Sequence, residues 1–88
     1  MVEKNVKVIN PLGVHARPAS MVVQTAIKFK SAIQLVKDGT TADAKSIMSV
    51  MMLAAACGSE VTVKADGEDA EEAVEAIVAL FGKKFNEG

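Results

Sequence analysis

A single histidine occurs in the chain, within the stretch GVHARPAS at residues 13–20. His15 supplies an imidazole, which is a good nucleophile when neutral and a better leaving group when protonated. Arg17 carries a permanent positive charge on a planar set of donors that suits phosphate. This pair predicts a site that binds an anion, and reversible phosphoryl transfer is the chemistry that such an imidazole suits.

The backbone around His15 adds donors to this site. Ala16, Arg17 and Pro18 are expected to form the first turn of a helix, where the missing N–H of proline costs little. The amides of Ala16 and Arg17 can then bind a negative group on His15, because they lie at the positive end of the helix. Gly13 permits unusual backbone shapes and leaves room for an approaching partner. The simpler alternative is that His15 only caps a helix and Arg17 is a solvated surface charge.

Hydrophobic patterning predicts the elements that position this site. Alternating apolar and polar residues are typical of half-buried strands, and apolar residues three or four apart are typical of helices packed on one side. The predicted strands cover residues 2–9, the region around 33–35, residues 41–44 and residues 60–65. The predicted helices run from the GVHARPAS stretch to about residue 29, from Ser46 to just before Gly58, and from residue 70 to the Phe81–Phe85 region.

Turn and cap residues separate these segments. Asp38-Gly39 favours a tight hairpin turn, because both central positions want a positive φ. Gly58 suits the C-terminal end of the second helix. Asp69, followed three residues later by Glu72, is similar to a capping box and predicts the start of the last helix.

The resulting order, βαββαβα, predicts one domain over residues 1–88. We expect an α+β open-faced sandwich with a four-stranded antiparallel sheet and three helices on one face. Only three Phe and no Trp or Tyr are present, so Ala, Val and Met must fill most of the core. The residues expected on the buried side of the last helix are Ala70, Ala73, Val74, Ile77, Leu80, Phe81 and Phe85.

Composition limits the functional classes. A formal net charge of −1 gives no electrostatic signature of nucleic-acid binding. The longest apolar run, Ile47–Cys57, is interrupted by Ser49 and is too short to span a membrane. Cys57 is the only cysteine, so no internal disulfide can form, and no signal peptide is recognisable; we expect a cytoplasmic protein. With one histidine and one cysteine, we expect neither a metal nor another cofactor.

The stretch GVHARPA resembles the active-site signature of the HPr family, the histidine-containing phosphocarriers of the bacterial phosphoenolpyruvate:sugar phosphotransferase system. A second stretch, KSIMSVMML at residues 45–53, is similar to the regulatory serine segment of that family. The resemblance covers essentially all 88 residues. It implies that Nδ1 of His15 takes a phosphoryl group from phospho-enzyme I and passes it to the IIA domains of sugar permeases, with Arg17 stabilising the transfer. It also implies a monomeric carrier rather than a stand-alone enzyme.

The resemblance assigns a regulatory role to Ser46. It implies phosphorylation of Ser46 by HPr kinase/phosphorylase with ATP, and binding to a transcriptional regulator. Serine is a good N-cap residue, and a phosphate at a helix start is favoured by the helix dipole. Adding nearly two negative charges beside a docking surface would repel an acidic partner. The alternative is that Ser46 serves only as a cap.

The segment after Ser46 is too apolar on all sides for a helix that lies on a sheet. We expect Ile47, Met48 and Met51 to be exposed beside His15 as a docking surface, because flexible methionines suit several partners. Val50 and Leu53 are expected in the core. The alternative is that the methionines fill gaps in the core. Ser20 and Gln24 match positions near partner contacts in the family.

Three positions depart from the family pattern, and other functions remain open. Leu12 replaces a small polar residue found in several relatives, Ser49 replaces a common glycine, and Cys57 replaces a frequent lysine or other polar residue. The alternatives are a carrier in the nitrogen-related branch of the same relay and a regulatory interaction module that acts through the Ser46–Met51 surface. A hydrolase using Ser20 and His15 is disfavoured, because no acidic orienting residue or oxyanion motif is present.

Overall fold

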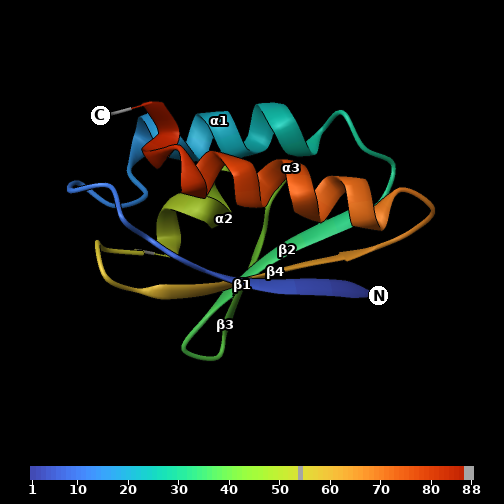
Figure 1. The fold of residues 1–88 in the computed structure, drawn as a ribbon, viewed down its shortest axis with the longest axis horizontal. Helices are drawn as coiled ribbons and strands as arrows, with labels where there is room; N and C mark the ends of the chain where they lie inside the picture. Colours follow the sequence, from blue (N-terminus) through green and yellow to red (C-terminus); the bar gives the residue numbers. More distant parts are fainter. Residues whose placement is uncertain (54, 87–88) are drawn as a thin grey trace.

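The computed structural model describes residues 1–53 and 55–86, in which the elements follow the predicted βαββαβα order (Figure 1). A short 3₁₀ turn, η1, follows the last helix. The elements are β1 (Val2–Lys7), α1 (Ala16–Ala26), β2 (Ala32–Lys37), β3 (Thr40–Asp43), α2 (Ile47–Met52), β4 (Glu60–Asp66), α3 (Ala70–Gly82) and η1 (Lys84–Asn86).

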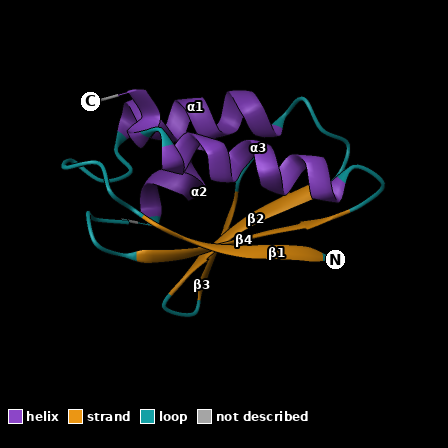
Figure 2. Cartoon of the chain, viewed as in Figure 1, coloured by secondary structure: helices purple, strands orange, loops and turns teal. Residues whose placement is uncertain are grey.

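The four strands form one antiparallel sheet in the order β1-β4-β2-β3. β4 is the last strand in the chain, yet it lies between β1 and β2 and pairs with both. Figure 2 shows all three helices on one face of the sheet, with the other face uncovered. The open-faced α+β sandwich predicted from the sequence is therefore confirmed.

The core lies between the helices and the covered face of the sheet. Buried and less buried side chains alternate along β4, as the period of two predicted. Phe81 and Phe85 pack edge to face with their ring centroids 4.8 Å apart. Phe85 is buried as predicted but belongs to η1, and Leu80 is only half-buried. The other positions predicted to be buried in the last helix are buried.

The hairpin between β2 and β3 is also as predicted. Asp38 has a φ of 49° and Gly39 a φ of 79°, the positive values that a tight two-residue turn requires. β3 begins one residue earlier than expected, at Thr40.

The second helix is shorter than predicted. α2 ends at Met52, whereas the sequence predicted a helix that continues to just before Gly58; residue 54 lies outside the described residues. The carbonyl of Ala55 instead accepts a hydrogen bond from the Val14 amide at 2.8 Å. This long-range bond takes the carbonyl that a continuing helix would use. Gly58, with a φ of 94°, turns the chain toward β4 and is not the cap of α2.

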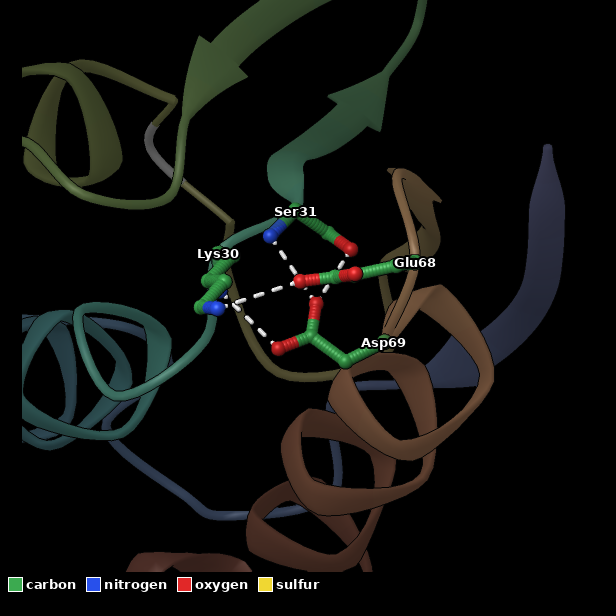
Figure 3. A network of polar contacts seen from close by, with 4 residues as sticks. All are labelled: Lys30, Ser31, Glu68 and Asp69. Atoms are coloured by element: carbon green, nitrogen blue, oxygen red, sulfur yellow. Dashed lines mark hydrogen bonds and ion pairs between the residues drawn. The ribbon is translucent and has the colours of Figure 1, made fainter.

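The predicted capping box at the start of α3 is wrong. Asp69 is the N-cap residue, but its side chain makes no capping hydrogen bond. Figure 3 shows that its carboxylate faces Lys30 and Ser31, at the start of β2. It accepts hydrogen bonds from both backbone amides, each at 2.9 Å, and from the Ser31 hydroxyl. The carboxylate therefore joins α3 to β2, which a local sequence pattern does not reveal.

Candidate functional site

His15 lies between the loop that follows β1 and the first turn of α1, as predicted. Its backbone is extended, with a φ of −97° and a ψ of −162°, and its carbonyl accepts a hydrogen bond from the Ala19 amide at 2.9 Å. The imidazole makes no capping hydrogen bond, and the residue is partly exposed. The cap of α1 is therefore the backbone of His15 and not its ring.

The first turn of α1 brings positive electrostatic character next to His15. Ala16 and Arg17 are exposed, Pro18 is buried, and no acidic residue lies in this turn. The amides of Ala16 and Arg17 have no acceptor within the helix because they precede its first hydrogen bond. A negative group near His15 would therefore lie close to two N–H donors and the positive end of the helix dipole, in a turn that also contains the cationic Arg17.

Gly13 supports the site differently from what the sequence suggested. Its φ is 70°, and a Cβ atom there would lie 2.6 Å from the carbonyl oxygen of Ala55 and 3.0 Å from the Cα of Ala56. The space that the missing side chain leaves is filled by this neighbouring segment. The prediction that Gly13 makes room for a partner is therefore wrong, because the residue is buried against its own chain.

Asn10 was not predicted to support the site. The residue is buried, and its side-chain Nδ2 donates a hydrogen bond to the carbonyl of Gly13 at 2.6 Å. The signal that was present is the order Asn10-Pro11-Leu12-Gly13, which is typical of a β-turn.

Ser46 occupies the N-cap position of α2, as predicted. Its hydroxyl oxygen accepts a hydrogen bond from the Ser49 amide at 3.3 Å, and its carbonyl accepts one from Val50 at 3.0 Å. The neighbouring Lys45 donates from Nζ to the carbonyl of Phe29 at 2.9 Å, which fixes the approach to α2. Ser46 is half-buried, so its hydroxyl lies near the surface at a helix start.

The exposed side of α2 is apolar. Ile47, Met48 and Met51 are exposed, while Val50 and Leu53 are buried, in agreement with the sequence prediction. Met52 is 76% exposed and adds to this surface, although it was not among the residues predicted to form it. The methionines of α2 therefore do not fill gaps in the core.

α1 contacts α2, so the helix that begins at His15 lies beside the helix that carries these side chains. Along α1, Gln24 donates from Nε2 to the hydroxyl oxygen of Ser20 at 3.2 Å. Gln24 is exposed and Ser20 half-buried. Both residues therefore lie on the helix that contacts α2.

The described residues include one cysteine, but no metal-binding group and no membrane-spanning helix. Residues 1–53 and 55–86 contain no group of three or more His, Cys, Asp or Glu side chains placed to bind a metal ion. Cys57 is exposed and unpaired with another cysteine. No helix in this part of the chain has the length and hydrophobicity needed to cross a bilayer.

Comparison with known proteins places the chain in a family. It matches the family model of the PTS HPr component phosphorylation site over residues 2–83. It is 52% identical over 87 residues to phosphocarrier protein HPr of Treponema pallidum, covering 99% of each chain. The crystal structure of HPr-C-His from Thermoanaerobacter tengcongensis has a TM-score of 0.96 at 45% identity, covering 100% of this chain and 99% of that one. An HPr dimer from the same organism has a TM-score of 0.79 at 46% identity, covering 99% and 100%.

The family match extends from β1 to the end of α3. It therefore includes both the stretch that contains His15 and the segment that contains Ser46. The similarity of sequence and the similarity of fold cover the same residues. On these grounds the chain belongs to the HPr family, whose members are phosphocarriers of the phosphotransferase system and not stand-alone enzymes.

Proposed function

We propose that His15 carries the phosphoryl group. Its Nδ1 attacks the phosphorus of phospho-enzyme I, and the bond between phosphorus and enzyme I breaks as the new N–P bond forms. A IIA domain of a sugar permease then takes the same group and restores the neutral imidazole. The observation that carries this proposal is the partly exposed ring at the N-cap of α1, next to Arg17 and two helix-start amides.

Arg17 and the Ala16 and Arg17 amides have a common task in this proposal. The phosphoryl group carries negative charge throughout the transfer, and donors already oriented toward it stabilise the transition state without reorganisation. The first turn of α1 contains no acidic residue that would oppose this charge. No metal ion is needed for the step as proposed.

The test is incubation with enzyme I and phosphoenolpyruvate, followed by intact mass measurement before and after acid treatment. The wild type is expected to gain one acid-labile phosphoryl group, and His15→Ala is expected to gain none while remaining folded. A folded wild type of unchanged mass, or equal labelling of His15→Ala, would exclude His15 as the carrier.

The proposed docking surface consists of Ile47, Met48 and Met51 on α2, with Ser20 and Gln24 on α1. Residues 8–37 and 44–59 include this surface and contain basic residues but no Asp or Glu. All eleven acidic residues of the chain lie elsewhere. An apolar surface on segments whose charged residues are all basic suits enzyme I and IIA domains with acidic docking sites.

We further propose that Ser46 is the regulatory site, phosphorylated with ATP by HPr kinase/phosphorylase. A phosphate there would remain favourable for the start of α2 but would place negative charge beside Ile47 and Met48, which opposes an acidic partner. An acid-stable phosphate that is absent in Ser46→Ala and that slows His15 loading is expected. Equal loading rates with and without this phosphate would remove the regulatory role.

A regulatory interaction module is the second candidate function, favoured by the 69% exposure of Met48 and the 76% exposure of Met52. Such a module would bind a transcriptional regulator through α2 as a monomer, without using His15. His15→Ala would then keep full affinity for that partner, whereas Met48→Ser would lose it. A carrier in the nitrogen-related branch would instead require His15, and its protein partners would be different.

A further inference from the structure

Asn10 is buried with no exposed surface, five residues before His15. Among the described residues, Ser31 is the other buried polar residue, and its hydrogen bonds to Asp69 account for it. Burying a side-chain amide costs free energy unless hydrogen bonds replace those made to water. The position of the Asn10 amide therefore has a structural reason, and that reason lies in the loop that leads to His15.

Asn10 closes the turn that precedes His15 in two ways. Its carbonyl accepts a hydrogen bond from the Gly13 amide at 3.1 Å, and its Nδ2 donates to the Gly13 carbonyl at 2.6 Å. Pro11 at the second position of this turn restricts φ to a value that the turn needs. Asn10 therefore binds both backbone polar groups of Gly13, the N–H through its own carbonyl and the carbonyl through its side chain.

The peptide unit between Gly13 and Val14 is consequently held at both ends. Its carbonyl oxygen is bound by Nδ2 of Asn10, and its N–H group donates to the carbonyl of Ala55 at 2.8 Å. The plane of this peptide sets the direction in which the chain enters His15. On the other side, the Ala19 amide holds the His15 carbonyl at 2.9 Å.

We propose that Asn10 is a positioning residue for His15. Through the Gly13–Val14 peptide, its side-chain amide directs the imidazole toward the donors at the start of α1. The inference rests on the phosphocarrier function proposed above. Displacement of a reacting group by about 1 Å can reduce a rate about 100-fold, so a loosened peptide affects the transfer step without affecting docking.

The test compares Asn10→Ala with Asn5→Ala as phosphoryl acceptors from enzyme I. Asn5 is exposed on the uncovered face of the sheet and accepts a hydrogen bond from the Thr62 hydroxyl at 2.6 Å. Both variants therefore lose an asparagine hydrogen bond, but only one loses it beside His15. With Asn10→Ala as the acceptor, we expect the kcat of enzyme I to fall at least about tenfold and its KM for the acceptor to change less than about twofold. With Asn5→Ala, neither constant should change.

Asn10→Asp keeps the size of the side chain but removes the donor, and it covers the case in which Asn10→Ala folds poorly. The unphosphorylated proteins are also compared by NMR. The ring resonances of His15 should shift and the Val14 amide should exchange faster in both Asn10 variants but not in Asn5→Ala. Wild-type kcat and unshifted ring resonances in a folded Asn10 variant would overturn the inference. A wild type that accepts no phosphoryl group would instead refute the proposed function, and the ring resonances would still decide the role of Asn10.

Discussion

Arg17 differs from the other basic residues of this region in its position and not in its charge. It lies in the first turn of α1, whereas Lys28 follows the end of the same helix and is also exposed. Arg17→Gln is expected to slow phosphoryl uptake by about 10- to 100-fold, because an oriented donor at the transferred group is lost. Lys28→Gln should retain the wild-type rate. Comparable slowing in both variants would mean that general positive charge, and not the placement of Arg17, is what matters.

Gly13 should tolerate no side chain, since its Cβ would meet backbone atoms that cannot rotate away. Gly39 provides the comparison, because its φ is also positive but a Cβ there would have open space. Gly39→Ala should lower the free energy of unfolding by about 1 kcal/mol from backbone strain alone. Gly13→Ala should lower it by about 1–3 kcal/mol more, from overpacking. Urea denaturation measures both, and equal losses would contradict the close contact with residues 55–56.

Prediction from the sequence succeeded for residues whose chemistry is visible in the side chain itself. The location of His15 at a helix start and of Ser46 at an N-cap follows from local patterns. Asn10 was missed because an asparagine in a turn is ordinarily exposed, whereas the fold buries this one completely. The alternative that the ring of His15 is a helix cap could be excluded only by the hydrogen bonds of the fold.

At the scale of elements, Asp69 gives α3 a pH-dependent link to the start of β2. The Ser31 hydroxyl and then the Lys30 amide lower the pKa of Asp69 to about 2 from its usual value of 3.8. Since folding favours the ionised carboxylate, this stabilisation is complete above about pH 4 and is lost as the pH falls through 2. Asp69→Asn should therefore unfold at lower urea concentration than the wild type near neutral pH, with the gap closing in acid.

The measurement is the urea midpoint of each protein at about pH 7 and about pH 2.5. Asp66→Asn removes a negative charge of the same kind from an exposed position at the end of β4 and serves as the control. If the gap between wild type and Asp69→Asn were the same at both pH values, the carboxylate would not be the group that joins the two elements.

Two of the errors in predicting elements have one cause. The length of α2 and the capping box of α3 were inferred from residues close together in the sequence. In the structure, the Val14 amide donates a hydrogen bond to the carbonyl of Ala55, and the loop before β2 donates to the carboxylate of Asp69. Val14 lies 41 positions from Ala55, and Lys30 and Ser31 lie 39 and 38 positions from Asp69. These long-range hydrogen bonds replace the local ones that a helix end or a capping box would make.

At the scale of the whole molecule, the charge distribution predicts how partners associate. The part of the chain that contains the His15 loop, α1 and α2 is cationic, although the formal net charge is −1. Electrostatic attraction to an acidic partner should make kcat/KM for phosphoryl uptake fall about tenfold between low salt and about 0.5 M salt. Stopped-flow or quenched-flow kinetics in sodium chloride would check this. A rate independent of salt would leave the apolar side of α2 as the whole docking determinant.

The overall architecture was predictable because the longer strands repeat apolar residues at about every second position, and the first and last helices at every third or fourth. The order of elements then restricts the topology to few solutions. What could not be predicted is which loops touch, since those contacts depend on how the completed layers bring segments 8–14 and 55–59 together. These contacts hold the loop that leads to His15, whereas the residues proposed to react or to bind phosphate can be recognised in the sequence by their type.

The uncovered face of the sheet offers a practical route to watching this protein at work. Gln34 is exposed on β2 between the buried Ile33 and Leu35, so it belongs to the face of the sheet away from the core. A thiol-reactive fluorophore at Gln34→Cys, in a chain whose exposed Cys57 has been changed to serine, would tumble with the molecule without obstructing α1 or α2. Fluorescence anisotropy could then follow each encounter in real time.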